Sequence, residues 1–186
     1  MQVQTTSLDG VLLFVPTPHR DERGWFSRTF DAAAARDAGL DPDAFLQDSQ
    51  SRSAHGVIRG MHGRRDTGEA KLVRCAHGAI HDVVVDARPG SPTFGQSAAF
   101  LLDDETMHSL YIPRGFLHGF QSLTETADTC YRIDAEHDAS ADLAVAFDDP
   151  ELAIAWPLPP TLVSARDRAA GSWADARKLL TMTTAP

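Results

Sequence analysis

The chain breaks into many short, β-rich segments, and this feature restricts its fold most strongly. Eight apolar segments are each bounded by Gly, Pro, Asp or Ser: VLLFVP, KLVRCA, AIHDVVVDA, SAAFLL, HSLYIP, GFQSL, TCYRI and LAVAFDD. This spacing of strands and turns is typical of a β-sandwich or barrel, and it differs from the alternation of strands and helices in βα units. We therefore expect an all-β fold.

Helical pattern is confined to two places. DAAAARDAGL ends near Gly39, with Pro42 just beyond it, and SWADARKLL begins with Ser172 as its expected N-cap. The last residues, TMTTAP, are expected to fray. No repeat, low-complexity tract or linker divides the 186 residues, which suffice for one substantial core. Residues 1–186 are thus predicted to form a single domain with a few short peripheral helices.

Charge and composition exclude several classes of protein. A net charge of −9 argues against general nucleic-acid binding, because a phosphate backbone would be repelled. Cys75 and Cys130 are too few for a disulfide framework. The N-terminus lacks the pattern of a signal peptide, and the sequence contains no run of 18 apolar residues, the length needed to cross a membrane. A cytoplasmic protein that binds neither membrane nor nucleic acid is the simplest interpretation.

Basic residues gather between residues 47 and 74, in QDSQSRSAHGVIRGMHGRRDTGEAKLVR. This stretch holds five arginines and one lysine around His62 in an otherwise acidic chain. Alternating strands could direct several of them into one barrel mouth, where a phosphate would meet paired guanidinium donors. A solvated strand face with a structural histidine is the competing interpretation, because charged runs are usually exposed.

Histidines raise the question of a metal. A mononuclear metal cupin requires two closely spaced histidines and a carboxylate, with a further histidine later in the chain. That HxH spacing is missing here, because HGRR follows Met61 and the next acidic residues are Asp66 and Glu69. A metal site assembled from His62, His81 and His118 remains the alternative to a metal-free protein.

Without a metal, His62 suits the removal of a proton from a carbon next to a ketone. Such a base needs a carboxylate to hold its tautomer and stabilise the imidazolium, and Asp167 in SARD is a candidate. A tyrosine phenol can return a proton from the opposite face, and only Tyr111 and Tyr131 exist. Cationic groups near the ketone oxygen would stabilise the enolate.

Seven motifs occur in the order found in dTDP-4-dehydrorhamnose 3,5-epimerases, and the chain resembles this family from about Val11 to Leu180. They are DERGWFSRTF, FLQDSQSRSAHGVIRGMH, KLVRCAHG, DVVVDARPGSPTFGQ, LYIPRGFLHGF, DDPELAIAWP and SARD. The resemblance implies a cupin jelly roll, a homodimer, no metal and no organic cofactor. It also implies a 4-keto-6-deoxy sugar carried on a nucleoside diphosphate as the substrate, with the dTDP-linked form expected.

The resemblance also assigns roles to residues. His62 matches the general base, Asp167 its orienting partner and Tyr131 the proton donor, while Lys71 and His118 match cationic and hydrogen-bonding residues around the sugar. In the family, an N-terminal segment commonly reaches across the dimer. The positions expected to contact substrate are Arg23, Arg28, Gln47, Ser49, Arg59, His118, His137, Asp142 and Arg166. For Arg23 and Gln47, a role in turns is the competing interpretation.

Several of these positions depart from the family pattern. Arg28 replaces a usual Glu, Ser49 a usual Asn and Asp142 a usual Glu, and Arg64 stands where Gln is common. His137 stands where an aromatic residue stacks on the base, and imidazole offers less stacking surface. His81 appears where an apolar residue is usual. These departures leave the acid–base residues intact and cluster at positions expected to contact the substrate.

Sequence therefore predicts an epimerase that inverts C3, C5 or both through an enolate, for rhamnose-type or natural-product sugar biosynthesis. A single inversion competes with a double one, because both can use the same base. A cupin dehydratase that uses His62 to start β-elimination is a second hypothesis. A sugar-nucleotide binding protein without catalytic activity is a third.

Overall fold

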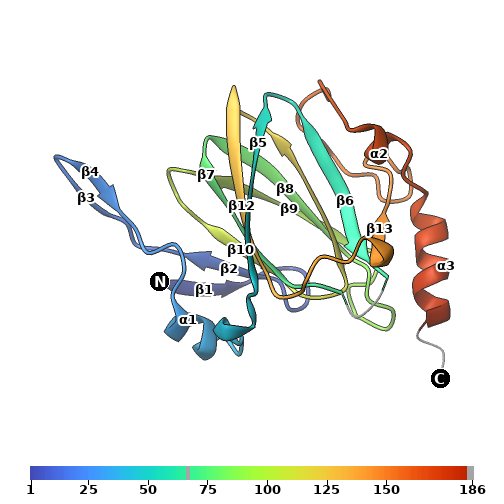
Figure 1. Ribbon diagram of the computed structural model, residues 1–186, viewed down its shortest axis with the longest axis horizontal. Coiled ribbons are helices and arrows are strands. Elements are labelled where there is room, and N and C mark those ends of the chain that lie inside the picture. The colour runs from blue at the N-terminus through green and yellow to red at the C-terminus, as the bar shows by residue number, and fades with distance from the viewer. Residues whose placement is uncertain (66–67, 184–186) are drawn as a thin grey trace.

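Two antiparallel sheets packed face to face make up the body of the protein in the computed structural model, which describes residues 1–65 and 68–183 (Figure 1). The larger sheet has six strands, in the order β1 (Gln2–Thr5), β2 (Leu12–Val15), β10 (Ser109–Ile112), β7 (Lys71–His77), β12 (Thr126–Ile133) and β5 (Gln47–Ala54). The second sheet has five, in the order β13 (Asp142–Ala144), β6 (Ile58–Arg64), β11 (Phe116–Ser122), β8 (Ala79–Asp86) and β9 (Ser97–Asp103). The predicted all-β sandwich is confirmed.

Helices lie at the periphery of the sandwich (Figure 1). The first predicted helix is α1 (Ala32–Asp37), which Asp31 caps by accepting from two backbone N–H groups. The second is α3 (Trp173–Thr183), and Ser172 Oγ accepts from Asp175 N–H at 3.2 Å, as expected of an N-cap. Two 3-10 helices, Pro42–Ala44 and Ala139–Ala141, and the short helix α2 (Ala165–Arg168) complete the set.

The predicted fraying of TMTTAP is wrong for its first three residues, because α3 continues through Thr183. Buried residues Trp173 and Ala176 hold the helix on the second hydrophobic cluster of the protein, together with Leu143. Residues 184–186 lie outside the described part of the chain. Among the described residues, no helix is long and apolar enough to span a membrane.

Apolar residues between the two sheets form the main core. Val73, Ile80, Leu102 and Leu110 are fully buried there, which accounts for the apolar segments seen in the sequence. Burial of a Val, Leu or Ile side chain contributes about 1.5–3 kcal/mol to stability. Between the sheets there is also a cavity, to which β5, β6 and β12 contribute polar side chains.

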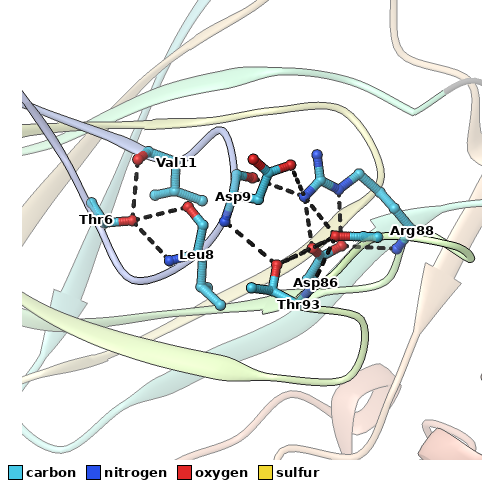
Figure 2. A network of polar contacts seen from close by, with 8 residues as sticks. Thr6, Leu8, Asp9, Val11, Asp86, Arg88 and Thr93 are labelled. Carbon is cyan, nitrogen blue, oxygen red and sulfur yellow. Dashed lines mark hydrogen bonds and ion pairs between the residues drawn. The ribbon is translucent and has the colours of Figure 1, made fainter.

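A polar network ties the N-terminal segment to the turn after β8 (Figure 2). Buried Asp86 accepts from Arg88 Nη2 at 2.6 Å and from Thr93 Oγ1 at 2.6 Å. Arg88 also donates to the backbone carbonyl of Asp9 at 2.8 Å. Although burial opposes it, these donors hold the pKa of Asp86 below its usual value, so the carboxylate stays charged and keeps the network intact.

One hairpin stands away from the sandwich. Strands β3 (His19–Asp21) and β4 (Gly24–Phe26) pair only with each other, and Figure 1 shows them projecting from the body of the molecule. All six strand residues are exposed, including Trp25 at 51% and Phe26 at 70%. Large apolar side chains on a projecting element are typical of a surface that binds another protein.

Candidate active site

A cavity of about 610 Å³ opens between the two sheets. Its wall combines strands β5, β6, β7, β11 and β12 with the segment around α2. Eight of the residues predicted from the sequence line it: Ser49, Arg59, His62, Lys71, His118, Tyr131, Arg166 and Asp167. Thus the structure brings all four predicted catalytic residues into one cavity with four of those predicted to bind substrate.

Two glycines let the central strands of this wall approach closely. A Cβ on Gly60 would lie 2.5 Å from Gly119 Cα, so neither β6 nor β11 could carry a side chain at this point. Just beyond it, His62 and His118 are direct partners across the two strands. The glycines in the motifs RGMH and LHGF therefore place two imidazoles side by side at the cavity.

His62 is paired with Asp167. The distance from His62 Nε2 to Asp167 Oδ1 is 2.7 Å, and the carboxylate is almost completely buried. If Nε2 carries the proton donated to Asp167, then Nδ1 carries the lone pair that can accept one. Burial lowers the pKa of His62, and the opposing effect of Asp167 is smaller. His62 is therefore neutral near pH 7, as a general base must be.

Asp167 reaches His62 because α2 is fixed on the second sheet. Ile58 N–H donates to the Leu162 carbonyl at 3.1 Å, and Ile58 pairs with Val163 in a parallel bridge. Ser164 then caps α2 by accepting from the N–H of Asp167 at 3.0 Å. This local structure explains how a residue more than a hundred positions away in the chain orients His62.

His118 has a carboxylate partner of its own. Its Nε2 lies 2.7 Å from Oδ2 of Asp82, which is completely buried in β8. The His118 ring also meets the ring of Tyr131 edge-on, with centroids 6.1 Å apart. Sequence reasoning missed Asp82, and the only signal was an acidic residue within an apolar strand, which requires a buried partner.

Tyr131 lies on β12 beside Ser49 of β5, which is its direct partner across the strands. Burial raises the pKa of the Tyr131 phenol well above its ordinary value, and the negative charge of Asp82 adds to this effect. The phenol is therefore protonated at neutral pH and can donate a proton. Tyr111, the other candidate, does not line the cavity.

Cationic side chains lie on the same wall. The Lys71 ammonium is 3.0 Å from Glu69, and Arg59 donates through Nε to Ser53 at 3.0 Å. At the rim, Arg166 pairs with Asp142 at 2.6 Å, so Asp142 adjoins the cavity without lining it. A cavity that presents cations and a neutral histidine is suited to an anionic ligand and to the stabilisation of an enolate.

Besides Asp142, four residues predicted to bind substrate lie outside this cavity. Arg23 and Arg28 belong to the projecting hairpin region and pair with Asp21 and Asp31, respectively. Gln47 begins β5, and His137 lies in an exposed loop after β12. The cavity lining of a single chain thus does not include these four residues. Their contacts with substrate stay predictions.

Of the three histidines considered for a metal site, His62 and His118 are neighbours, but His81 lies apart from them. His81 packs its ring against Trp156, with centroids 6.1 Å apart, and it is not part of the cavity wall. Within residues 1–65 and 68–183, no cluster of three or more His, Cys, Asp or Glu side chains has the arrangement of a metal site. Asp66, considered with them, lies outside the described residues.

Comparison with known proteins places this site in a family. Residues 5–175 match the family of dTDP-4-dehydrorhamnose 3,5-epimerases. The enzyme of that name from Pseudomonas aeruginosa is 39% identical over 177 residues, which cover 95% of this chain and 98% of the relative.

Two solved structures share the fold closely. NovW, a 4-keto-6-deoxy sugar epimerase from the novobiocin gene cluster of Streptomyces spheroides, superimposes with a TM-score of 0.91 at 36% identity, covering 96% of this chain and 90% of NovW. ChmJ, a 3'-monoepimerase from Streptomyces bikiniensis in complex with dTDP-quinovose, gives 0.87 at 35% identity, covering 94% and 89%.

These similarities and the cavity define an isomerase built on a cupin jelly roll. The chain belongs to the dTDP-4-dehydrorhamnose 3,5-epimerase family. Both the predicted fold and the predicted class of enzyme are thereby confirmed.

Proposed function

We propose that the protein epimerises C3, C5 or both of a dTDP-linked 4-keto-6-deoxy sugar in deoxysugar biosynthesis. The observation that carries this proposal is the convergence of His62, Tyr131 and Lys71 on one cavity. A neutral base, a protonated phenol and an ammonium are the three groups that proton exchange beside a ketone requires. The substrate class is supported by the similarity to NovW, a 4-keto-6-deoxy sugar epimerase, and to ChmJ, whose structure contains dTDP-quinovose.

The reaction begins at the carbon next to the C4 ketone. His62 removes its proton, the C–H electron pair moves to form an enolate, and the negative charge develops on the C4 oxygen. Asp167, at 2.7 Å, stabilises the imidazolium that results. Lys71 and His118 line the same cavity and stabilise the enolate oxygen electrostatically.

Tyr131 completes the inversion. Its phenol delivers a proton to the same carbon from the opposite face, the enolate collapses to the ketone, and the configuration is reversed. Proton transfer from His62 to the phenolate through solvent then restores both groups for the next turnover. Every proton in this scheme is carried by a side chain of the protein or by water, so the proposal includes no metal or organic cofactor.

Incubation of the protein with dTDP-4-keto-6-deoxyglucose in deuterated water tests this function. Deuterium at both C3 and C5 of the product supports double epimerisation, and deuterium at one carbon supports a single inversion. The resemblance to ChmJ, a 3'-monoepimerase, makes inversion at C3 alone the second candidate. A product lighter by one water would instead identify a dehydratase, and absence of any exchange would leave a binding protein.

We also propose that the protein acts as a homodimer in which the β3–β4 hairpin contacts the other copy. Exposed Trp25 and Phe26 support this arrangement, and so does the fact that Arg23 and Arg28 do not line the cavity of their own chain. The same hairpin would then supply both arginines to the partner's nucleotide site.

Light scattering after gel filtration tests the dimer. The native protein is expected at twice the chain mass, and the double variant W25A/F26A is expected to shift toward the monomer. An unchanged mass for the variant would exclude the hairpin from the interface. We further propose a single domain over residues 1–186 that works in the cytoplasm, which the free thiols of Cys75 and Cys130 support.

A further inference from the structure

Lys71 belongs to a nearly buried group of three charges at the cavity wall. Its ammonium lies 3.0 Å from Glu69 Oε1, while Glu69 Oε2 lies 3.6 Å from Nη1 of Arg64. The three side chains are only 12%, 19% and 8% exposed, in the order Lys71, Glu69, Arg64. Glu69 is therefore shared by two cations, one on each of its carboxylate oxygens.

The surroundings of Glu69 are fixed on both sides. Arg64 donates to the backbone carbonyl of Glu136 at 2.9 Å, which anchors the far end of the group. Next to Glu69, the N–H of Ala70 donates to Asp134 Oδ1 at 2.7 Å, and Asp134 N–H donates back to the Ala70 carbonyl. The backbone next to Glu69 is thus anchored by hydrogen bonds. One oxygen of the Glu69 carboxylate faces the fixed guanidinium of Arg64, and the other can hold the ammonium of Lys71.

A lysine facing a cavity needs such a restraint. Its side chain has four rotatable carbons and carries about 2 kcal/mol of rotamer entropy, so an unrestrained ammonium samples many positions. Enolate stabilisation is strong only when the cation is already in place as the charge develops. The charge of Lys71 also acts on His62, whose pKa it helps to lower.

We propose that Glu69 is a positioning residue for the epimerase: it holds the Lys71 ammonium at the place where the sugar's enolate oxygen forms. This inference rests on the proposed function, because it assumes that Lys71 stabilises the enolate. Glu69 does not line the cavity, so it acts through Lys71 rather than on the substrate. Arg64 keeps the carboxylate from turning away.

Four variants test the inference: E69Q, E69D, K71Q and the double variant E69Q/K71Q. Gln keeps the size of Glu69 and one hydrogen-bond acceptor but removes its charge. As a matched control, E151Q breaks the exposed pair between Glu151 and Arg177, which lies away from the cavity. For each protein, kcat and KM are measured with dTDP-4-keto-6-deoxyglucose across pH, and Tm is recorded.

E69Q is expected to lower kcat about tenfold with little change in KM, because a charged hydrogen bond is lost while the binding contacts remain. The acid limb of the profile should move to lower pH, since Lys71 loses its counter-charge and disfavours the imidazolium more strongly. In the K71Q background, E69Q should cause no further loss of kcat, whereas E151Q should match the native protein. E69D, which keeps the charge, should retain the native pH profile.

The positioning role would be overturned if E69Q had the kinetics of the native protein. It would also be overturned if E69Q lowered kcat by the same factor in the native and in the K71Q background. If E69Q does not fold, the comparison of E69D with the native protein tests the positioning role instead. Retraction of the carboxylate by one methylene should lower kcat without raising KM, and an unchanged kcat would contradict the proposal. Failure of the native protein to exchange deuterium would instead contradict the proposed function itself, so the two failures are distinguishable.

Discussion

Two His–Asp pairs lie side by side in this protein, and they differ in their surroundings. Both have a nitrogen–oxygen distance of 2.7 Å, and their histidines face each other across β6 and β11. The His62 side chain is 37% exposed, whereas the His118 side chain is 6% exposed and its partner Asp82 is completely buried. The His62 imidazole is open to a substrate, while the His118 imidazole is held within the sheet.

The carboxylates also come from different parts of the fold. Asp82 belongs to β8, a central strand of the second sheet, whereas Asp167 lies on a four-residue helix reached through a long connection. Burying one pair deep in the sheet fixes its geometry. Placing the other at the cavity allows proton transfer. This difference supports the proposed proton transfer by the His62 pair and a fixed, cavity-lining position for the His118 imidazole.

The largest predicted effect is that of H62N. We expect the rate of epimerisation to fall by about 10⁴-fold, because the loss of a general base removes the first proton transfer. Stability should fall by only about 1 kcal/mol, since Asp167 lies next to a cavity that water can enter. Calorimetry with dTDP should show that nucleotide binding is retained, and loss of nucleotide binding would show that His62 holds the ligand instead.

Y131F tests whether Tyr131 delivers its proton to the face of the sugar carbon opposite His62. We expect inversion to slow by about 10²-fold, because the phenol that returns the proton is missing. His62 can still remove a proton and return one to the same face, so unreacted substrate should exchange deuterium with retained configuration. Mass spectrometry of recovered substrate measures this exchange. Inversion at the native rate would remove Tyr131 from the mechanism.

In contrast to H62N, H118N should reduce stability strongly and activity only moderately. The variant leaves the completely buried Asp82 carboxylate without its imidazole partner, so unfolding should become easier by about 3 kcal/mol. We expect kcat to fall only about tenfold, because one stabilising group among several is lost. Denaturant titration and steady-state kinetics give the two values, and a larger loss of stability in H62N than in H118N would break the comparison.

The pH profile provides the smallest predicted effect. Burial lowers the pKa of His62, so kcat/KM should rise with pH and reach half its maximum below about 6.5, the ordinary value for histidine. Asp167 opposes this effect, so D167N should move the midpoint to still lower pH as well as reducing the rate. No alkaline decline from Tyr131 is expected below about pH 10, because burial raises the pKa of its phenol. A midpoint above 6.5 would contradict a neutral, buried base.

The fold was largely predictable because most strands bury one or both faces. The segment AIHDVVVDA forms β8, whose last five residues are all buried, and apolar runs of this kind are strong signals. Strand β5 was harder to recognise, because Ser49 and Ser51 line the cavity and replace the usual apolar alternation. Helix α2 has four residues, which is too short for helical periodicity to appear.

Long-range contacts limited what the sequence could establish about the site. His62 and Tyr131 follow from motif resemblance and from chemistry, but no local pattern shows that Asp82 faces His118. The His118–Asp82 pair arises from the pairing of β11 with β8, whereas Glu69 and Lys71 are only two residues apart in the chain. The position of Arg23 was equally hard to predict, because it lies in a hairpin whose two strands pair only with each other.

Deuterium incorporation by the native protein and by H62N, compared in one experiment, tests the role of His62 most directly. Each protein is incubated with dTDP-4-keto-6-deoxyglucose in deuterated water, and both product and residual substrate are examined by mass spectrometry. The native protein should introduce deuterium at C3, C5 or both, and H62N should introduce none while still binding dTDP. Exchange by H62N at the native rate would show that another group removes the proton.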